Sequence, residues 1–120
     1  MESQTIYHRI ILKVSGEALQ NETDGSIYDE KKLKELAEVV KSAHEKGTQM
    51  GIVVGAGNIW RGRMAEKVGI ERSTADYMGM LGTIMNALAL QSVLESLGLD
   101  TRVLSAINVP EACEPYIRRK

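Results

Sequence analysis

Two short apolar runs, each followed by a glycine-containing turn, constrain the fold of this chain most. Residues 8–14 lead into Ser15-Gly16, and residues 49–54 lead into Gly55-Ala56-Gly57. Continuous β-branched runs are typical of parallel strands that are covered on both faces. The segment between them has the spacing of an amphipathic helix, so the unit is strand–helix–strand, and such crossovers are right-handed. The sequence therefore predicts an α/β fold with a parallel sheet.

The connecting helix is predicted over residues 30–46. Asp29 is the expected N-cap, because its carboxylate can accept hydrogen bonds from the first free N–H groups, and Gly47 marks the end. Apolar residues recur at helical spacing from Leu33 to Ala43, with lysines and glutamates on the other face. We expect this helix to pack on the sheet.

A second, longer helix is predicted over residues 74–97, with Ser73 or Thr74 as its N-cap and Asp76 in its first turn. Its apolar residues surround most of the circumference, which indicates burial in a large protein or an interface. Gly79 and Gly82 lie within this helix, where glycine is less favourable than alanine. We therefore expect a backbone or ligand to pack closely against them.

Residues 101–106 predict a third strand, and Pro110 is the expected start of a short helical segment. Apolar strands that alternate with amphipathic helices favour helices on both faces of one sheet. We therefore expect a three-layer α/β/α sandwich in which strands 8–14, 49–54 and 101–106 run parallel in one sheet.

Composition excludes several classes of protein. The 120 residues are 43% hydrophobic and 26% charged, which is ordinary for one modest globular domain. A net charge of −1 argues against a dedicated nucleic-acid-binding protein, which would be strongly basic. Cys113 is alone, so no internal disulfide can form and a cytoplasmic location is expected. His8 and His44 lack companions at metal-ligand spacing, so we expect no protein-held metal. No signal peptide and no membrane span are expected.

The two glycine-containing turns have the features of phosphate-binding loops. Glycines let a backbone approach a phosphate closely, successive N–H groups form an anion-binding concavity, and each turn has a cation beside it, Lys13 or Arg61. Parallel sheets bind ligands at the carboxyl ends of their strands, where both turns would meet. Trp60 stands where a dinucleotide fingerprint needs a small residue, and neither turn has the lysine–hydroxyl pair of a Walker A loop. The pattern favours a phosphoryl transferase that holds two phosphorylated groups.

Four motifs together resemble the amino acid kinase family. The first two are shared across that family, whereas the third is characteristic of its uridylate kinase branch, and the resemblance extends from Arg9 onward. The motifs are Lys13-Val14-Ser15-Gly16-Glu17-Ala18-Leu19, Gly55-Ala56-Gly57-Asn58-Ile59-Trp60-Arg61-Gly62, Thr74-Ala75-Asp76-Tyr77-Met78-Gly79-Met80-Leu81 and Glu114-Pro115-Tyr116-Ile117-Arg118-Arg119.

The resemblance implies transfer of the ATP γ-phosphoryl group to UMP, which gives UDP. It implies Mg²⁺ that arrives with ATP and is not held by this half of the protein. It also implies catalytic roles for Lys13 and Arg61. The residues implied to bind ATP are Lys13, Val14, Ser15, Gly16, Gly57 and Arg61, and those implied to bind UMP are Gly55, Ala56, Gly57, Arg61 and Asp76.

Two departures from the family pattern stand out. The family's glycine triplet is Gly-Ala-Gly here, and the Ala56 methyl group requires a negative φ or a more distant phosphate. The length matches only the N-terminal half of a family member, so residues 1–120 are expected to be the acceptor-nucleotide-binding half. The ATP-binding half would be absent, and this chain alone would be inactive.

The family also implies a homo-oligomer, a hexamer, assembled through the longer helix. The residues expected at its interface are Met78, Met80, Leu81, Ile84 and Met85.

Two other functions fit the same residues. One is a non-catalytic anion-binding or assembly module, in which the loops bind anions without chemistry. The other is a different amino acid kinase family member with a carboxylate acceptor, which the residues around Asp76 disfavour.

Overall fold

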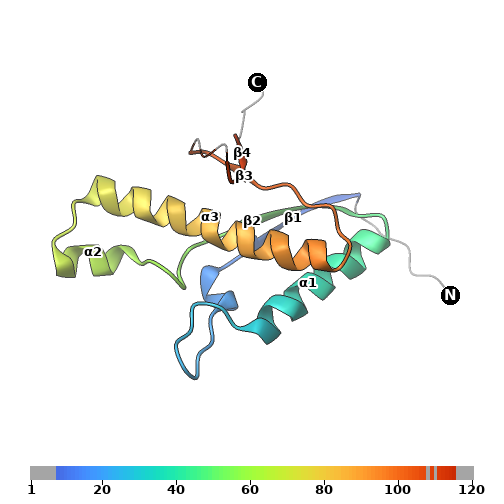
Figure 1. The fold of residues 1–120 in the computed structure, drawn as a ribbon, viewed down its shortest axis with the longest axis horizontal. Helices are drawn as coiled ribbons and strands as arrows, with labels where there is room; N and C mark the ends of the chain where they lie inside the picture. Colours follow the sequence, from blue (N-terminus) through green and yellow to red (C-terminus); the bar gives the residue numbers. More distant parts are fainter. Residues whose placement is uncertain (1–7, 108, 110, 116–120) are drawn as a thin grey trace.

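The computed structural model describes residues 8–107, 109 and 111–115. Strands β1 (Arg9–Val14) and β2 (Gln49–Val54) pair in parallel along their whole length, from Arg9 opposite Gln49 to Val14 opposite Val54. Helix α1 (Glu30–Glu45) connects them (Figure 1). The predicted strand–helix–strand unit is therefore confirmed.

Helix α1 begins after its predicted N-cap, Asp29, and ends just before Gly47. The Asp29 carboxylate accepts hydrogen bonds from the N–H groups of Lys31 and Lys32 at 2.9 and 3.3 Å. Gly47 follows the helix with a φ of 93°, a conformation that favours glycine. Leu33, Ala37 and Val40 are buried, so the apolar stripe faces the core as predicted.

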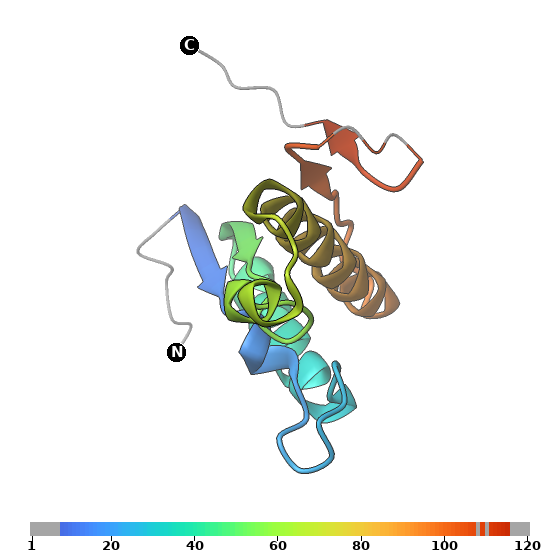
Figure 2. The ribbon, with the colours of Figure 1, turned by 90° about the vertical axis from the view of Figure 1, so that its left-hand side faces the viewer.

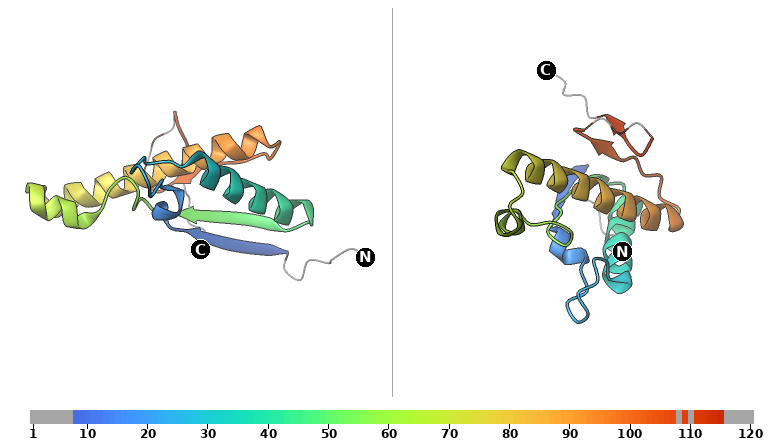
Figure 3. Two further views of the ribbon diagram at one scale, coloured as in Figure 1. Left: turned by 90° about the horizontal axis from the view of Figure 1, so that it is seen from below. Right: turned by 60° about the vertical axis from the view of Figure 1, so that its left-hand side comes forward.

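Both long helices lie on one side of the β1–β2 pair (Figure 3). Leu12 and Val14 of β1 and Ile52 of β2 pack against α1 and against Leu90 of α3 (Arg72–Ser96). The opposite face of the pair is not covered by any described element, and Ile11 on that face is 78% exposed. The α/β class and the parallel pairing are confirmed, and the described residues build two of the three expected layers.

Helix α3 begins earlier than predicted. Its N-cap is Glu71, without a side-chain capping bond, so the assignment of Ser73 or Thr74 as N-cap is wrong and Asp76 lies in the second turn. The cause is a tight connection from the preceding helix α2 (Gly62–Val68), which the sequence analysis missed. Gly69 ends α2 in the left-handed conformation with a φ of 76°, and α3 starts three residues later.

The third strand is not in the predicted sheet. Strand β3 (Leu104–Ser105) has two residues and pairs in parallel with β4 (Glu114–Pro115), in a second sheet. Figures 1 and 2 show this pair beside α3 and apart from β1 and β2. The reason is packing, because Val103 is buried against Ile84 and Cys113 instead of the β1–β2 pair. The expected helical start at Pro110 lies outside the described residues.

The burial of Ile84 also corrects the expected oligomer interface. Of the five residues placed there, Ile84 is covered by the segment that contains Val103 and Cys113. Met80, Leu81 and Met85 do stay exposed, at 42%, 42% and 47%.

Helix α3 has the length and composition of a membrane span, contrary to the expectation that no segment does. It has 25 residues, its mean hydropathy over an 18-residue window is 1.3, and 28% of that window is buried. Its inner side nevertheless packs on β2 and α1, and the buried Asn86 on it is hydrogen-bonded to a loop. These contacts are those of a helix that packs within a protein domain.

Candidate functional site

The two glycine turns interlock at the carboxyl ends of β1 and β2. The Gly55 N–H donates to the Val14 carbonyl at 2.9 Å, which continues the strand pairing into the turn. A Cβ atom on Gly16 would lie 2.5 Å from the Gly57 nitrogen and 2.9 Å from the Ala56 carbonyl carbon. Position 16 therefore needs glycine because the second loop occupies the space of a side chain.

The loop after β2 is closed by hydrogen bonds of its own backbone. The Ala56 carbonyl accepts from the N–H groups of Ile59 and Trp60, both at 2.9 Å, and this closes the turn. Among the described residues, nothing accepts a hydrogen bond from the N–H of Ala56 or Gly57. Successive free N–H groups of this kind can bind an anion.

Ala56 fits this loop without strain. No described residue other than glycine has a positive φ, so the Ala56 backbone is compatible with a methyl group. The methyl group lies against Gly82 of α3, where an added Cβ would be 2.9 Å from the Ala56 Cβ. Gly82 thus supplies the close packing that its glycine predicted.

Arg61 lies across the second loop and joins it to the first. Its Nε donates to the Gly57 carbonyl at 3.2 Å, and its guanidinium forms an ion pair with the Glu17 carboxylate at 2.6 Å. Glu17 belongs to η1 (Gly16–Leu19), the short 3-10 helix that follows β1. Both side chains are about half exposed, at 41% for Arg61 and 54% for Glu17. A phosphate that reaches Arg61 must therefore compete with one carboxylate.

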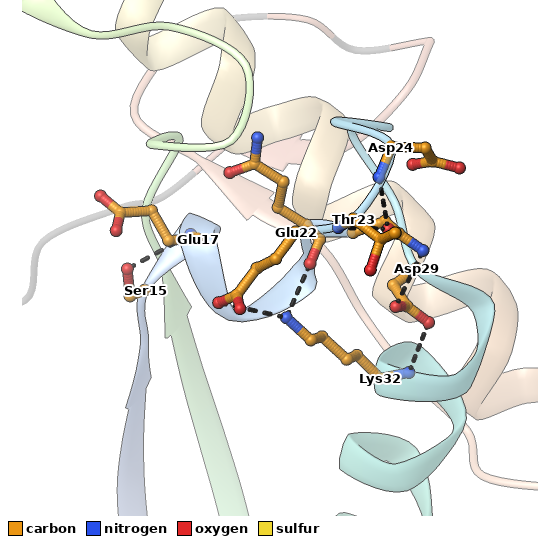
Figure 4. Close-up of polar contacts among 9 residues, drawn as sticks. Ser15, Glu17, Glu22, Thr23, Asp24, Asp29 and Lys32 are labelled. Atoms are coloured by element: carbon orange, nitrogen blue, oxygen red, sulfur yellow. Dashed lines mark hydrogen bonds and ion pairs between the residues drawn. The ribbon is translucent and has the colours of Figure 1, made fainter.

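The residues before Gly16 have distinct environments. Val14 is buried and contributes its carbonyl to the turn, while the Ser15 hydroxyl caps η1 by accepting from the Glu17 N–H at 3.3 Å (Figure 4). Lys13 is exposed on the open face of the strand pair, with the same strand parity as Ile11. Within the described part of the chain, Lys13 forms no ion pair, so its charge is available to a ligand.

Asp76 lies on α3, next to Ala75 in the sequence. It is exposed on α3. The indole N–H of Trp60 donates to the carbonyl of the neighbouring Ala75 at 3.0 Å, which ties the loop to this part of α3. A ligand that spans the loop and α3 would be needed to bring Asp76 and Arg61 to one molecule.

The loop before α1 is held by its own polar groups (Figure 4). The Asn21 side-chain carbonyl accepts from the N–H groups of Thr23 and Asp24, and Lys32 donates to the Gln20 carbonyl at 2.7 Å. The hydrogen bond from the Ser26 N–H lowers the pKa of the Asp24 carboxyl. Hydrogen bonds within the loop and to α1 therefore stabilise its conformation.

Sequence reasoning missed two groups at this site, Glu17 and the paired amides of Asn58 and Asn86. The Asn86 side chain is fully buried and donates to the Gly55 carbonyl at 2.7 Å. One signal was available, because a lone asparagine on the inner side of an apolar helix requires hydrogen-bond partners. The identity of those partners could not be read locally, since Asn86 and Gly55 are 31 residues apart.

The family profile of amino acid kinases matches residues 8–118. The chain belongs to the amino acid kinase family. It is 51% identical over 118 residues to the uridylate kinase of Pediococcus pentosaceus, covering 98% of this chain and 48% of that protein. It is 55% identical to the uridylate kinase of Rickettsia prowazekii, covering 95% of this chain and 47% of that protein.

Solved structures of this family match the same region. The UMP kinase from Ureaplasma parvum superposes with a TM-score of 0.87 at 40% identity, covering 94% of this chain and 47% of that one. The UMP kinase from Bacillus anthracis superposes with a TM-score of 0.86 at 42% identity, covering 92% and 46%. The chain thus spans about half the length of the relatives that it matches.

Proposed function

We propose that residues 1–120 form the acceptor-nucleotide-binding half of a UMP kinase, which transfers the γ-phosphoryl group of ATP to UMP and releases UDP and ADP. The observation that carries this proposal is the interlocking of the two turns, in which Gly16 lies against the Gly57 nitrogen and Arg61 spans the same loop. Support comes from relatives named uridylate kinase, which match nearly the whole chain at 51–55% identity.

On the acceptor side, the backbone of Gly55, Ala56 and Gly57 holds the UMP phosphate together with Arg61. The free N–H groups of Ala56 and Gly57 donate to phosphate oxygens, and the guanidinium leaves Glu17 to form charge-assisted bonds with the same group. Asp76 accepts a hydrogen bond from a ribose hydroxyl.

On the donor side, the ATP phosphates lie along the first turn. Lys13 neutralises phosphate charge, and the backbone from Val14 through Ser15 to Gly16 lines the phosphates, with Gly57 and Arg61 between donor and acceptor. The attacking oxygen of UMP is already anionic at neutral pH, so the reaction needs no strong general base. Lys13 and Arg61 therefore act by positioning the two phosphates and by stabilising charge in the transition state.

Mg²⁺ belongs to this proposal as a companion of ATP, and when bound it neutralises phosphate charge. The described residues contain no group of three histidine, cysteine, aspartate or glutamate side chains that could hold an ion.

The proposed enzyme is a cytoplasmic homo-oligomer whose ligands are ATP and UMP. The free thiol of Cys113 is compatible with the reducing cytoplasm.

A full-length kinase in which residues 8–118 replace the matching half of the Pediococcus pentosaceus relative tests the proposal. ATP turnover is measured with UMP, CMP, AMP, aspartate or glutamate as acceptor. We expect UDP formation that depends on UMP and exceeds turnover with every other acceptor. Phosphorylation of an amino acid would instead support the carboxylate-acceptor alternative. If the chain binds inorganic phosphate as tightly as UMP and the full-length kinase is inactive, the anion-binding module is correct.

A further inference from the structure

Two side-chain amides are buried beneath the second glycine loop and satisfy one another. Asn86 of α3 donates to the Asn58 side-chain carbonyl at 2.7 Å, and Asn58 donates back to the Asn86 carbonyl at 3.2 Å. The remaining N–H of Asn86 reaches the Gly55 carbonyl at 2.7 Å, and that of Asn58 reaches the Ile27 carbonyl at 2.9 Å. All four donor hydrogens of the pair are therefore used.

This pair controls the orientation of one peptide group in the loop. The Gly55 carbonyl and the Ala56 N–H belong to the same planar trans peptide, so they point in opposite directions. Asn86 holds the carbonyl toward α3, which turns the Ala56 N–H away from α3 and leaves it free among the described residues. The Gly55 N–H is fixed as well, by the Val14 carbonyl at 2.9 Å.

We propose that Asn86 is a positioning residue for phosphoryl transfer, because its amide sets the direction of the Ala56 N–H that meets the acceptor phosphate. This inference rests on the proposed function of the loop. Asn86 contacts no substrate and acts only through the Gly55–Ala56 peptide. Asn58 is its partner, since it occupies the hydrogen-bonding groups of Asn86 that the loop leaves unused.

Because the two amides are buried, their hydrogen bonds are difficult to replace. Asn86 is 0% exposed and Asn58 is 8% exposed, so a lost bond is not replaced by bulk water. Without the Asn86 donor the peptide can rotate, and a misplacement of about 1 Å in a phosphate-binding group costs up to about 10²-fold in rate. The loss should appear in the kinetic constants for UMP and not in those for ATP, because Gly55 and Ala56 lie on the proposed acceptor side.

The test compares Asn86→Leu and the milder Asn86→Ser with Gln91→Leu in the full-length kinase described above. Gln91 is a control on the same helix, because its side chain also donates to one backbone carbonyl, that of Thr101 at 3.0 Å, which lies outside the loop. For each variant, kcat and the KM values for UMP and ATP are measured at equal folded fraction, judged by circular dichroism.

We expect both Asn86 variants to lower kcat/KM for UMP about 10- to 100-fold while the KM for ATP stays within about twofold. Gln91→Leu should lose thermal stability without a change in either KM. If Asn86→Leu does not fold, Asn86→Ser decides. Wild-type kcat/KM for UMP in a folded Asn86 variant, or an equal loss in Gln91→Leu, would overturn the positioning role. An inactive parent enzyme would instead reject the proposed function itself.

Discussion

Arg61 is oriented by contacts within the site. Its guanidinium already bonds the Gly57 carbonyl and pairs with Glu17 at 2.6 Å, so its direction is set before any phosphate arrives. Because the pair is about half exposed, solvent screens it and exchange of the carboxylate for a phosphate costs little. Arg61 is therefore held in place but remains available.

From this we expect Arg61→Ala to lower kcat/KM for UMP about ten- to hundredfold in the full-length kinase, because each charge-assisted hydrogen bond contributes about 1.5–3 kcal/mol. Arg63→Ala is the control, since Arg63 is exposed on α2 two residues away. Steady-state kinetics measure both. Kinetic constants within twofold of the parent for Arg61→Ala would mean that Arg61 is a surface residue only.

The contact between Ala56 and Gly82 gives a second prediction at this scale. A Cβ on Gly82 would lie 2.9 Å from the Ala56 Cβ, so Gly82→Ala should displace the loop and cost about 1–3 kcal/mol of stability. Adding Ala56→Gly removes the colliding methyl group and should restore both stability and the KM for UMP. Thermal melts and kinetics on the single and double variants measure the coupling.

Gly79→Ala is the matched control for that experiment. The nearest atom to an added Cβ there is the Trp60 Cδ1 at 3.8 Å, which is ordinary contact. It should stabilise α3 by about 0.5–1 kcal/mol, because alanine is favoured over glycine within a helix. Equal effects of the two alanine substitutions would show that the Ala56 methyl group does not decide the loop position.

At the scale of elements, Tyr28 links the loop before α1 to the core. It packs against the core cluster that contains Val14, Leu19, Leu33 and Leu90, while its buried hydroxyl has no hydrogen-bond partner among the described residues. Burial raises the pKa of Tyr28 above its ordinary value of 10.0. The folded state therefore keeps Tyr28 neutral at a pH where the unfolded chain begins to ionise it.

The resulting stability is fully present below the unfolded pKa and is lost as pH rises through the folded pKa. We expect Tyr28→Phe to remove part of this alkaline loss and to raise stability at neutral pH by no more than about 1 kcal/mol. Absorbance titration near 295 nm, taken as the difference between parent and variant, isolates Tyr28 from the other tyrosines. A Tyr28 titration at its ordinary pKa would contradict this assignment.

The sequence could predict elements whose signals are local, but not elements whose bounds or partners depend on contacts with other segments. Helix α1 was predicted with its N-cap because Asp29, its apolar stripe and Gly47 are all local signals. The start of α3 was not, because the tight turn after Gly69 sets it and Ser73 resembles a better cap than Glu71 does. Residues 101–106 were expected beside β1 and β2, but strand propensity does not identify a partner. Val103 packs against Ile84, and β3 pairs with β4 instead.

The candidate site divides in the same way. The glycine turns and their cations could be predicted, because each is a short motif at the end of a strand. Glu17, Asn58 and Asn86 could not, because their roles depend on contacts that the fold creates between distant segments. The Asn58–Asn86 bonds, for example, join residues 28 positions apart.

At the scale of the whole molecule, apolar surface remains exposed on two sides. On the open face of the β1–β2 pair, Ile11 and Val53 are 78% and 54% exposed. On α3, Tyr77, Leu81 and Met85 recur at four-residue spacing and are 42–48% exposed, whereas Gly82 and Asn86 of the same helix are buried. Exposed apolar residues in such numbers favour association.

We therefore expect the purified 120-residue chain to associate in solution, with the exposed stripe of α3 in the contact. Leu81→Glu should reduce the assembly measured by light scattering, because it places a charge at the centre of the stripe. Val39→Glu is the control, since Val39 is 61% exposed on α1 and lies outside the stripe. If the parent chain is a compact monomer, the interface assignment is wrong. If only the Val39 variant dissociates, the contact is on α1 and the stripe of α3 has another role.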